Sequence, residues 1–542
     1  MTYRTEKAQA AHEAIIRYIK GVLNKEVVTA KINRLDFATL TETSINGHSH
    51  LLDAIHLSLV LAEKDVDEKI NFLIKIILKK AQELGKDALL FLLKTPCHRG
   101  FTPLNSLLKD GSLKNFKAFF AVIHDFIQAK YLTPQDYKDL LFFVNKYDKS
   151  ILNTFLHSEK QENFKAYFNE IHNSIDNGIL DVKDYINFIL SAEAPHSTIL
   201  HYANLINSAN FNLLFEEFNY LITQHYLPTN QFYDFISKID SNNLTLLQHI
   251  ITNNNLTILQ LFLKELKKSV QNQWISSADL SKLLLTTSVR GFSVIHLAIF
   301  DGSLELLQEL FNFLNECLNE DLLPKKTLQT LILIRNQTGL TAFASAIKTG
   351  KAELIAPFIN FIQQATKVHW LTANDYCKLF VQASNRGTTP LYLALFSQNI
   401  EFIKEYFLGL KEGLAQGYLK EKDIKLLFMK RTCDGDTCLA YVVKNGFLSL
   451  VKFFLQEVKE LCSNSYLTIL NQKIKGELVV CIGKNEDAKK INSLLNEERT
   501  GSLLNQSSPL AFSNRFFKPS VAKVINKAIN TFNFPGNRGS MT

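Results

Sequence analysis

The residues best suited to chemistry in this sequence are histidines. His48, His50 and His56 lie close together and could be imagined as metal ligands, but no cysteine stands at a matching offset, so packing or surface roles are favoured. His201 and His296 occupy the same place in two similar segments, "STILHYA" and "GFSVIHLA". A position that recurs along a chain belongs to its scaffold, and we therefore interpret both as structural histidines.

Cysteines and glycine loops offer no catalytic alternative. The seven cysteines form no CxxC pair and no cysteine–histidine cluster with zinc spacing, which is typical of reduced thiols in a cytosolic compartment. The segment "GELVVCIGKN" resembles a phosphate-binding loop, but Asn485 stands where a hydroxyl would coordinate a metal. No nucleophile elbow, zinc-protease or kinase signature is present. We predict that the protein is not an enzyme and has no cofactor and no metal site.

Arginine is the residue type whose placement suggests binding. Five of the eleven arginines lie in or just before expected turns, namely Arg99, Arg290, Arg335, Arg386 and Arg431. A guanidinium fork suits carboxylate or phosphate recognition, so we predict that this arginine stripe binds a partner. Two alternatives stay open. The arginines could simply be solvated, or the binding surface could lie on the second helix and the edge of the third helix, with exposed Phe and Tyr.

The elements that carry these residues repeat along the chain. A Ser or Thr with similar flanks, which we call the anchor, recurs at intervals of 47, 48 or 53 residues. The anchors are Ser49, Thr102, Ser150, Thr198, Thr245, Ser293, Thr341, Thr389 and Thr437. Most have a Gly two residues earlier, where a tight turn needs positive φ, and several have Ala five residues later, where helices approach closely. Each unit is predicted to begin as a turn, a short helix, a second turn and a longer helix.

The motifs "GFTPLNSL", "GFSVIHLA" and "GTTPLYLA" resemble the ankyrin repeat signature, and the resemblance covers residues 46–482. It implies a helical solenoid whose turns and first helices line a groove that binds other proteins. Ankyrin units have about 33 residues, whereas these have 48. The extra residues include segments such as "YLTPQD" and "WLTAND", in which a capping residue is followed by an acid, as at the start of a helix.

The fold prediction is therefore an all-α, ankyrin-like solenoid of about nine 48-residue three-helix repeats with helical caps. We expect an N-terminal helical cap over residues 1–45, the repeat array over 46–482, and a C-terminal capping helix with a basic tail over 483–542. Arrays of this kind need polar ends, because a repeat cannot bury its faces alone.

Composition limits the classes of partner. A net charge of +8 over 542 residues is mild, which argues against a nucleic-acid partner. The N-terminus lacks a secretory apolar segment, and no stretch reaches the ~18 apolar residues of a membrane span. We expect a protein that is cytoplasmic in the producing cell.

The final segment differs in composition, since no acidic residue follows Arg499. The chain is similar to type IV-secreted ankyrin effectors of intracellular bacteria, which implies translocation into a host cytoplasm and a host protein as partner. We predict a non-catalytic protein-interaction scaffold of this kind. The alternatives are an enzyme or enzyme regulator acting through the C-terminal segment, and a peripheral membrane-binding adaptor whose basic tail makes weak contact with the membrane surface.

Overall fold

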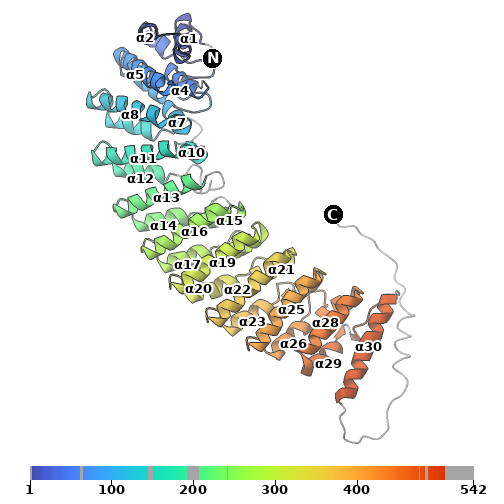
Figure 1. Ribbon diagram of the computed structural model, residues 1–542. Coiled ribbons are helices and arrows are strands. Elements are labelled where there is room, and N and C mark those ends of the chain that lie inside the picture. Colours follow the sequence, from blue (N-terminus) through green and yellow to red (C-terminus); the bar gives the residue numbers. More distant parts are fainter. Residues whose placement is uncertain are drawn as a thin grey trace, which may run out of the picture. The chain divides into compact units, whose positions relative to one another are not determined.

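The structure is a computed structural model that describes residues 3–60, 65–144, 151–191, 207–240, 242–474, 476–482 and 486–506. The helices follow one another in chain order (Figure 1). They form two compact units. The first unit comprises Met1–Val289 with Asp301–Pro324, and the second comprises Arg290–Phe300 with Lys325–Thr542.

The first unit begins with three helices before the first anchor, which are α1 (Glu6–Ile19), α2 (Lys25–Asn33) and α3 (Phe37–Leu40). Its repeats then contain α4 (His50–Val60), α5 (Val66–Leu84), α6 (Lys86–Lys94), α7 (Pro103–Lys109), α8 (Leu113–Gln128), α9 (Pro134–Leu141), α10 (Ile151–His157), α11 (Gln161–Asp176), α12 (Val182–Ile189), α13 (Ser208–Thr223), α14 (Thr229–Ser237), α15 (Leu246–Thr252), α16 (Leu256–Gln271), α17 (Ser277–Leu285) and α19 (Leu304–Asn319).

The second unit contains α18 (Val294–Phe300), α20 (Lys325–Leu333), α21 (Ala342–Thr349), the short 3-10 helix η2 (Ala352–Leu354), α22 (Ile355–Lys367), α23 (Ala373–Val381), α24 (Pro390–Phe396), α25 (Ile400–Ala415), α26 (Glu421–Met429), α27 (Cys438–Lys444), α28 (Leu448–Leu461), η3 (Ser463–Ser465), α29 (Tyr466–Leu470) and α30 (Glu486–Gln506). One small antiparallel hairpin, β1 (Lys473–Ile474) with β2 (Glu477–Leu478), pairs Lys473 with Leu478.

The predicted all-α repeat fold is confirmed. A complete repeat has a short first helix, a long second helix and a short third helix, as in α24, α25 and α26. The anchor hydroxyl caps the first helix: Thr341 Oγ1 accepts from Ala344 N, and Thr389 Oγ1 accepts from Tyr392 N. Anchors Ser150 and Thr198 lie outside the described residues.

The third helices begin at the capping sequences that predicted them. Thr133 and Asp136 exchange hydrogen bonds at the start of α9, and Thr372 and Asp375 do the same at the start of α23. Such reciprocal caps satisfy backbone N–H groups that have no partner within the helix. In the first repeat, whose spacing is 53 residues, the first two helices are both longer: α4 has 11 residues against 7 in α7, and α5 has 19 against 16 in α8.

The core lies between successive repeats. Second helices pack on one another in the first unit, as α13 does on α16 and α16 on α19. Each buries an apolar side, which for α16 includes Leu259, Phe262, Leu263 and Leu266. Removing such side chains from water is the main favourable term for a repeat that cannot fold alone.

At the chain ends, α1 packs on α4 and α5, and α30 packs on α28 and α29. The proposed boundaries at residues 45 and 482 remain predictions, and residues 507–542, with the basic tail, lie outside the described residues. No helix in the described ranges combines the length and apolar character that crossing a bilayer requires.

Candidate functional site: the turns and first helices of the second unit

In the described part of the chain, the turns before the anchors share one backbone geometry. The N–H five residues before the anchor donates to the carbonyl one residue before it, as in Asn336 to Leu340 at 2.9 Å and Thr432 to Asp436 at 2.9 Å. The Gly two residues before the anchor closes the turn, and Gly387 has φ of +72°. The predicted turn glycines are therefore explained by positive φ.

Successive turns of the second unit are joined by main-chain hydrogen bonds. Gln337 N–H donates to the Arg290 carbonyl at 3.1 Å, and Asn385 N–H donates to the Thr338 carbonyl at 3.2 Å. Cys433 N–H then donates to the Arg386 carbonyl at 2.8 Å. These bonds align four consecutive turns into a ladder, so their outward side chains are held at a regular spacing.

All five arginines of the predicted stripe are exposed, but they occupy two different turn positions. Arg335 and Arg431 lie six residues before their anchors, and their guanidinium groups bind backbone carbonyls. Arg335 Nε donates to Gly339 O at 2.7 Å, and its Nη2 donates to Ala383 O at 2.8 Å. Arg431 Nη2 donates to Lys473 O at 2.7 Å. These two side chains fasten one turn to the next.

Arg290 and Arg386 lie three residues before their anchors, and Arg99 has the same position in the first unit. Arg290 and Arg386 contribute their main-chain carbonyls to the ladder while their side chains extend into solvent. The structure thus places four of the predicted arginines on one set of turns. Arg335 and Arg431 hold the turns together, whereas Arg290 and Arg386 face solvent. The different offsets from the anchor were readable in the sequence, but the carbonyl partners were not.

Aromatic side chains accompany these turns on the first helices. Tyr392 and Phe396 lie on α24 and Tyr441 on α27, with ring centroids 5.0 Å apart for Tyr392–Tyr441 and 5.8 Å for Phe396–Tyr441. Phe396 is 63% exposed. We call these three residues the aromatic patch. Sequence reasoning missed it, because periodicity alone does not separate a packed aromatic ring from an exposed one.

The alternative location on the second and third helices remains a prediction, but in the repeat of α25 and α26 neither helix has an exposed aromatic ring. Phe402, Tyr406 and Phe407 of α25 are buried, and so is Phe428 of α26. These rings pack between repeats, where burial of an aromatic side chain is strongly stabilising. Apolar exposure on these helices is confined to aliphatic side chains such as Leu408.

Charged groups of both signs lie near the aromatic patch, since burial raises the pKa of the Tyr392 hydroxyl and the nearby carboxylates of Asp436 and Asp434 raise it further. Lys348 and Lys444 both lie seven residues after their anchors and are exposed, and Lys444 forms an ion pair with Asp436. Asp434 is the exposed acidic side chain of the neighbouring turn. The turns and first helices therefore present exposed guanidinium, ammonium and carboxylate groups, and one exposed ring, Phe396.

The predicted structural role of His296 is confirmed. Its Nδ1 lies 2.9 Å from Ser293 Oγ, and its Nε2 lies 3.1 Å from the Leu340 carbonyl of the next repeat. Burial lowers the pKa of His296 to about 4, against the opposing effect of the bond to Leu340. The imidazole is neutral near pH 7 and serves packing. His201 lies outside the described residues.

The remaining candidates for chemistry are the cysteines, the segment that resembles a phosphate loop and possible metal ligands. The seven cysteines are free thiols, and burial raises the pKa of Cys438 to about 12, which makes that thiol unreactive. The segment that resembles a phosphate loop forms β2 in its described part. Among the described residues, no three His, Cys, Asp or Glu side chains converge on a metal position.

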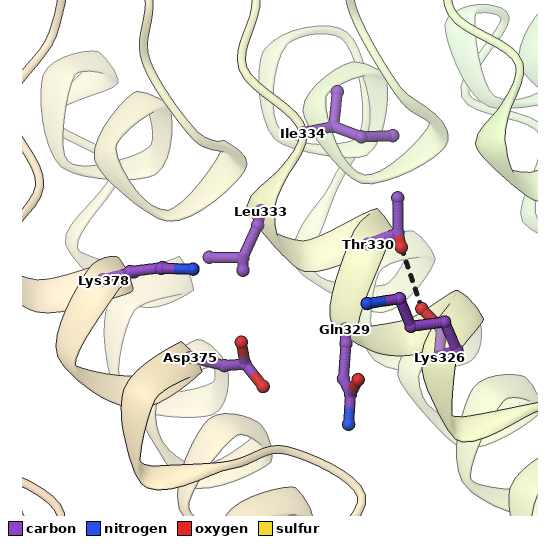
Figure 2. A pocket seen from close by; sticks show the side chains of 7 residues that line it. All are labelled: Lys326, Gln329, Thr330, Leu333, Ile334, Asp375 and Lys378. Atoms are coloured by element: carbon purple, nitrogen blue, oxygen red, sulfur yellow. Dashed lines mark hydrogen bonds between the residues drawn. The ribbon is translucent and has the colours of Figure 1, made fainter.

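One hollow of about 280 Å³ lies between α20 and α23 (Figure 2). Asp375, one of its polar groups, already caps α23 through Thr372, and Gln329 Nε2 donates to the Trp370 carbonyl at 3.1 Å. Lys326 and Lys378 also line it. Because the scaffold uses these central polar groups, the hollow is not a preformed ligand site.

Two solved ankyrin repeat structures are similar to this chain. No family model matches the chain, and no curated protein matches it. Among solved structures, the ankyrin repeat domain of Bcl-3, a member of the IkappaB family, shares 16% identity, with 44% of this chain and 91% of that chain covered and a TM-score of 0.26. An ankyrin repeat protein from Leishmania major shares 12% identity, with 56% and 97% covered and a TM-score of 0.28. Similarity at this level does not establish membership of a family.

Proposed function

We propose that the protein is a non-catalytic scaffold that binds another protein through the turns and first helices of its second unit. The observation that carries this proposal is the combination of solvent-facing Arg386 with the aromatic patch, whose Phe396 is exposed on the helix that follows the Arg386 turn. Arg290 faces solvent from an earlier turn of the same ladder. Arginine and aromatic residues are the types most enriched at protein-binding hot spots. A ladder of hydrogen-bonded turns holds them in place, which lowers the entropy cost of binding.

The chemistry of the surface defines the kind of partner. Guanidinium and ammonium groups favour carboxylates or phosphorylated side chains, and the aromatic patch favours apolar side chains beside them. The proposed partner is therefore a protein surface that carries acidic and apolar residues together. Arg99 would extend binding in the first unit, where it occupies the same turn position.

Photo-crosslinking tests where the partner binds. A photoreactive phenylalanine analogue at Phe396 should crosslink to a specific protein, whereas the same analogue at Leu408 should not. Leu408 is a matched control, because it is an exposed apolar residue of the same repeat, 48% accessible, but lies on the second helix. Equal crosslinking from both positions, or none from Phe396, would contradict the proposed surface.

Two substitutions then test the two classes of arginine. One measures binding of the crosslinked partner and the other measures stability. Arg386→Glu should weaken binding by tenfold or more, with a reduced dependence on salt, while changing stability by less than about 0.5 kcal/mol. Arg335→Ala should reduce the free energy of unfolding by about 1 kcal/mol, because it leaves backbone carbonyls of two turns without their donor. Calorimetric titration and urea unfolding provide the two readouts.

The role of an effector that is translocated into a host cell remains a hypothesis based on sequence character. It can be tested with a translocation reporter fused to the full chain and to a chain lacking residues 507–542. The two alternatives, an enzyme or regulator acting through the C-terminal segment and a peripheral membrane adaptor, concern residues 483–542, of which the structure describes 486–506. Vesicle flotation with the same two chains tests the membrane alternative.

A further inference from the structure

A buried carboxylate connects the start of the chain to the first repeat. Asp53 of α4 is fully buried and is surrounded by hydrogen-bond donors. Tyr3 OH donates to its Oδ2 at 2.5 Å, and His12 Nδ1 lies 3.0 Å from the same oxygen. His48 Nδ1 lies 3.0 Å from Oδ1. Because Tyr3 and His12 belong to the N-terminal segment, this one side chain fastens that segment to α4.

Two further imidazoles complete the cluster. His50 is buried and stacks on Tyr3 with ring centroids 4.5 Å apart, and His56 stacks on His48 at 4.7 Å. His50 Nε2 lies 3.3 Å from the Thr39 carbonyl, while its buried Nδ1 has no hydrogen-bond partner among the described residues. His56 Nε2 lies 3.5 Å from Ser106 Oγ of the next repeat.

The cluster contains four imidazoles but, among its described residues, one fully buried carboxylate, Asp53. His12 and His48 lie against Asp53, whereas His50 stacks on Tyr3 and His56 stacks on His48. The other titratable or charged groups near the cluster are Glu42, Cys97, Arg99 and Asp110. Glu42 already accepts hydrogen bonds from Thr5. A second buried imidazolium would therefore lack a counter-charge, which is costly at low dielectric constant.

The protonation states follow from these contacts. Burial opposes charge on Asp53, yet the hydrogen bonds from His12, His48 and Tyr3 lower the pKa of the carboxyl to about 2. Burial likewise opposes charge on His48, but its bonds to Asp53 and Cys97 raise its pKa to about 9. His50 differs, since burial lowers its pKa to about 4. Burial and the nearby charge of His48 also lower the pKa of His56.

We propose that this cluster is a proton-sensitive latch that holds α1 on α4 near neutral pH and releases it on acidification, when a second imidazolium forms without a buried counter-charge. The other buried residues in the first three turns of α1 are small, namely Ala8, Ala11 and Ala14, whereas the end of the helix buries Ile15, Tyr18 and Ile19. Small side chains bury little apolar area, so the polar cluster has its largest share in fixing the first turns of α1.

The sign of the pH dependence follows from linkage. His50 is neutral in the folded cluster, but it binds a proton readily once exposed, at its ordinary pKa of about 6.5. Its contribution to latch stability therefore falls as pH drops from about 6.5 towards 4. The contribution of His48 has the opposite sign, since it is complete below about 6.5 and is lost as pH rises towards 9. The latch is consequently most stable near neutral pH.

Hydrogen exchange of the full-length protein tests the latch. Amides of α1 should exchange faster as pH falls from 6.5 to 5, after correction for intrinsic rates, with the opening equilibrium rising up to about tenfold per pH unit for each proton taken up. Amides of α17, which lies in the same unit as α1 and contains no histidine, provide an internal control. Corrected protection of α1 that stays constant over this range would overturn the proposal.

A variant pair assigns the effect to the cluster. His50→Gln combined with His56→Gln should remove most of the pH dependence of α1 exchange, whereas His98→Gln should leave it unchanged. His98 is a suitable control, because it is an exposed histidine on the neighbouring turn. If the double variant responds to acid like the wild type, the cluster is not the sensor.

Titration of the unmodified protein gives an independent check if the double variant does not fold. Followed by NMR of the imidazole C–H groups, one histidine of the cluster should stay protonated above pH 8, and another should stay neutral below pH 5.5. Titration of all cluster histidines near pH 6.5 would contradict the proposed charge distribution.

Discussion

The turn glycines show how one residue can meet two separate structural demands. Gly387 has φ of +72°, and a Cβ at this position would lie 2.7 Å from the Arg431 carbonyl of the next turn. Gly417 has nearly the same φ of +73°, but a Cβ there would meet no atom within 4 Å. The two positions therefore separate backbone strain from the close approach of neighbouring turns.

We predict that Gly417→Ala lowers the free energy of unfolding by about 1 kcal/mol, the cost of a left-handed backbone for an L-residue. Gly387→Ala should cost about 1–3 kcal/mol more, because the turn must also move away from the Arg431 carbonyl. Urea unfolding of both variants measures the difference. Equal losses would mean that the turns can separate without cost and that the ladder contributes little.

The first helix α18 is held by hydrogen bonds both within and beyond its own repeat. The anchor hydroxyl caps the helix locally, while His296 of α18 connects Ser293 in its own repeat to the Leu340 carbonyl in the next. A buried neutral imidazole that both accepts and donates suits this position. A protonated ring would keep the bond to Leu340 but would place a charge in the core.

We predict that the stability of the second unit falls by up to about 1.4 kcal/mol per pH unit as pH drops from 6.5 to 4. The pKa of His296 is lowered to about 4 by burial, so the unfolded chain binds its proton first. Urea unfolding followed by Trp370 emission in a Trp274→Phe background measures this unit, because Trp370 lies within it. His296→Asn should be less stable at pH 7 but should show a flatter pH profile. A wild-type profile without slope would show that His296 does not titrate on unfolding.

The molecule as a whole is stabilised mainly by contacts between neighbouring repeats. Successive second helices pack on each other, as do successive first helices such as α21, α24 and α27. A chain organised in this way behaves as a row of coupled units, and distant parts influence each other only through the repeats between them. The division into two compact units is consistent with that behaviour.

We predict that the two tryptophans report different unfolding transitions, since Trp274 belongs to the first unit and Trp370 to the second. Single-tryptophan variants, Trp274→Phe and Trp370→Phe, should give distinct urea midpoints by fluorescence, with a broad transition by circular dichroism. Coincident midpoints by all three probes would show that the whole array unfolds as one cooperative unit.

The sequence by itself determined the repeat, its helices and its caps. Anchor spacing, turn glycines and capping residues are local signals, because a cap or a positive φ involves residues only a few positions apart. Thr389 and Asp375 therefore have the roles that their sequence context predicted. The structural role of His296 was equally readable, since recurrence marks a scaffold position.

The tertiary structure decided which side chains face solvent and which serve the scaffold. Arg335 and Arg386 look equivalent as arginines in turns, yet one binds carbonyls of the next turn and the other faces solvent. His48 and His50 were expected to be packing or surface residues, but both belong to a buried cluster on Asp53 that includes Tyr3. Such contacts join residues about 50 positions apart. Only the packing of one repeat on the next brings them together, so no local pattern could specify them.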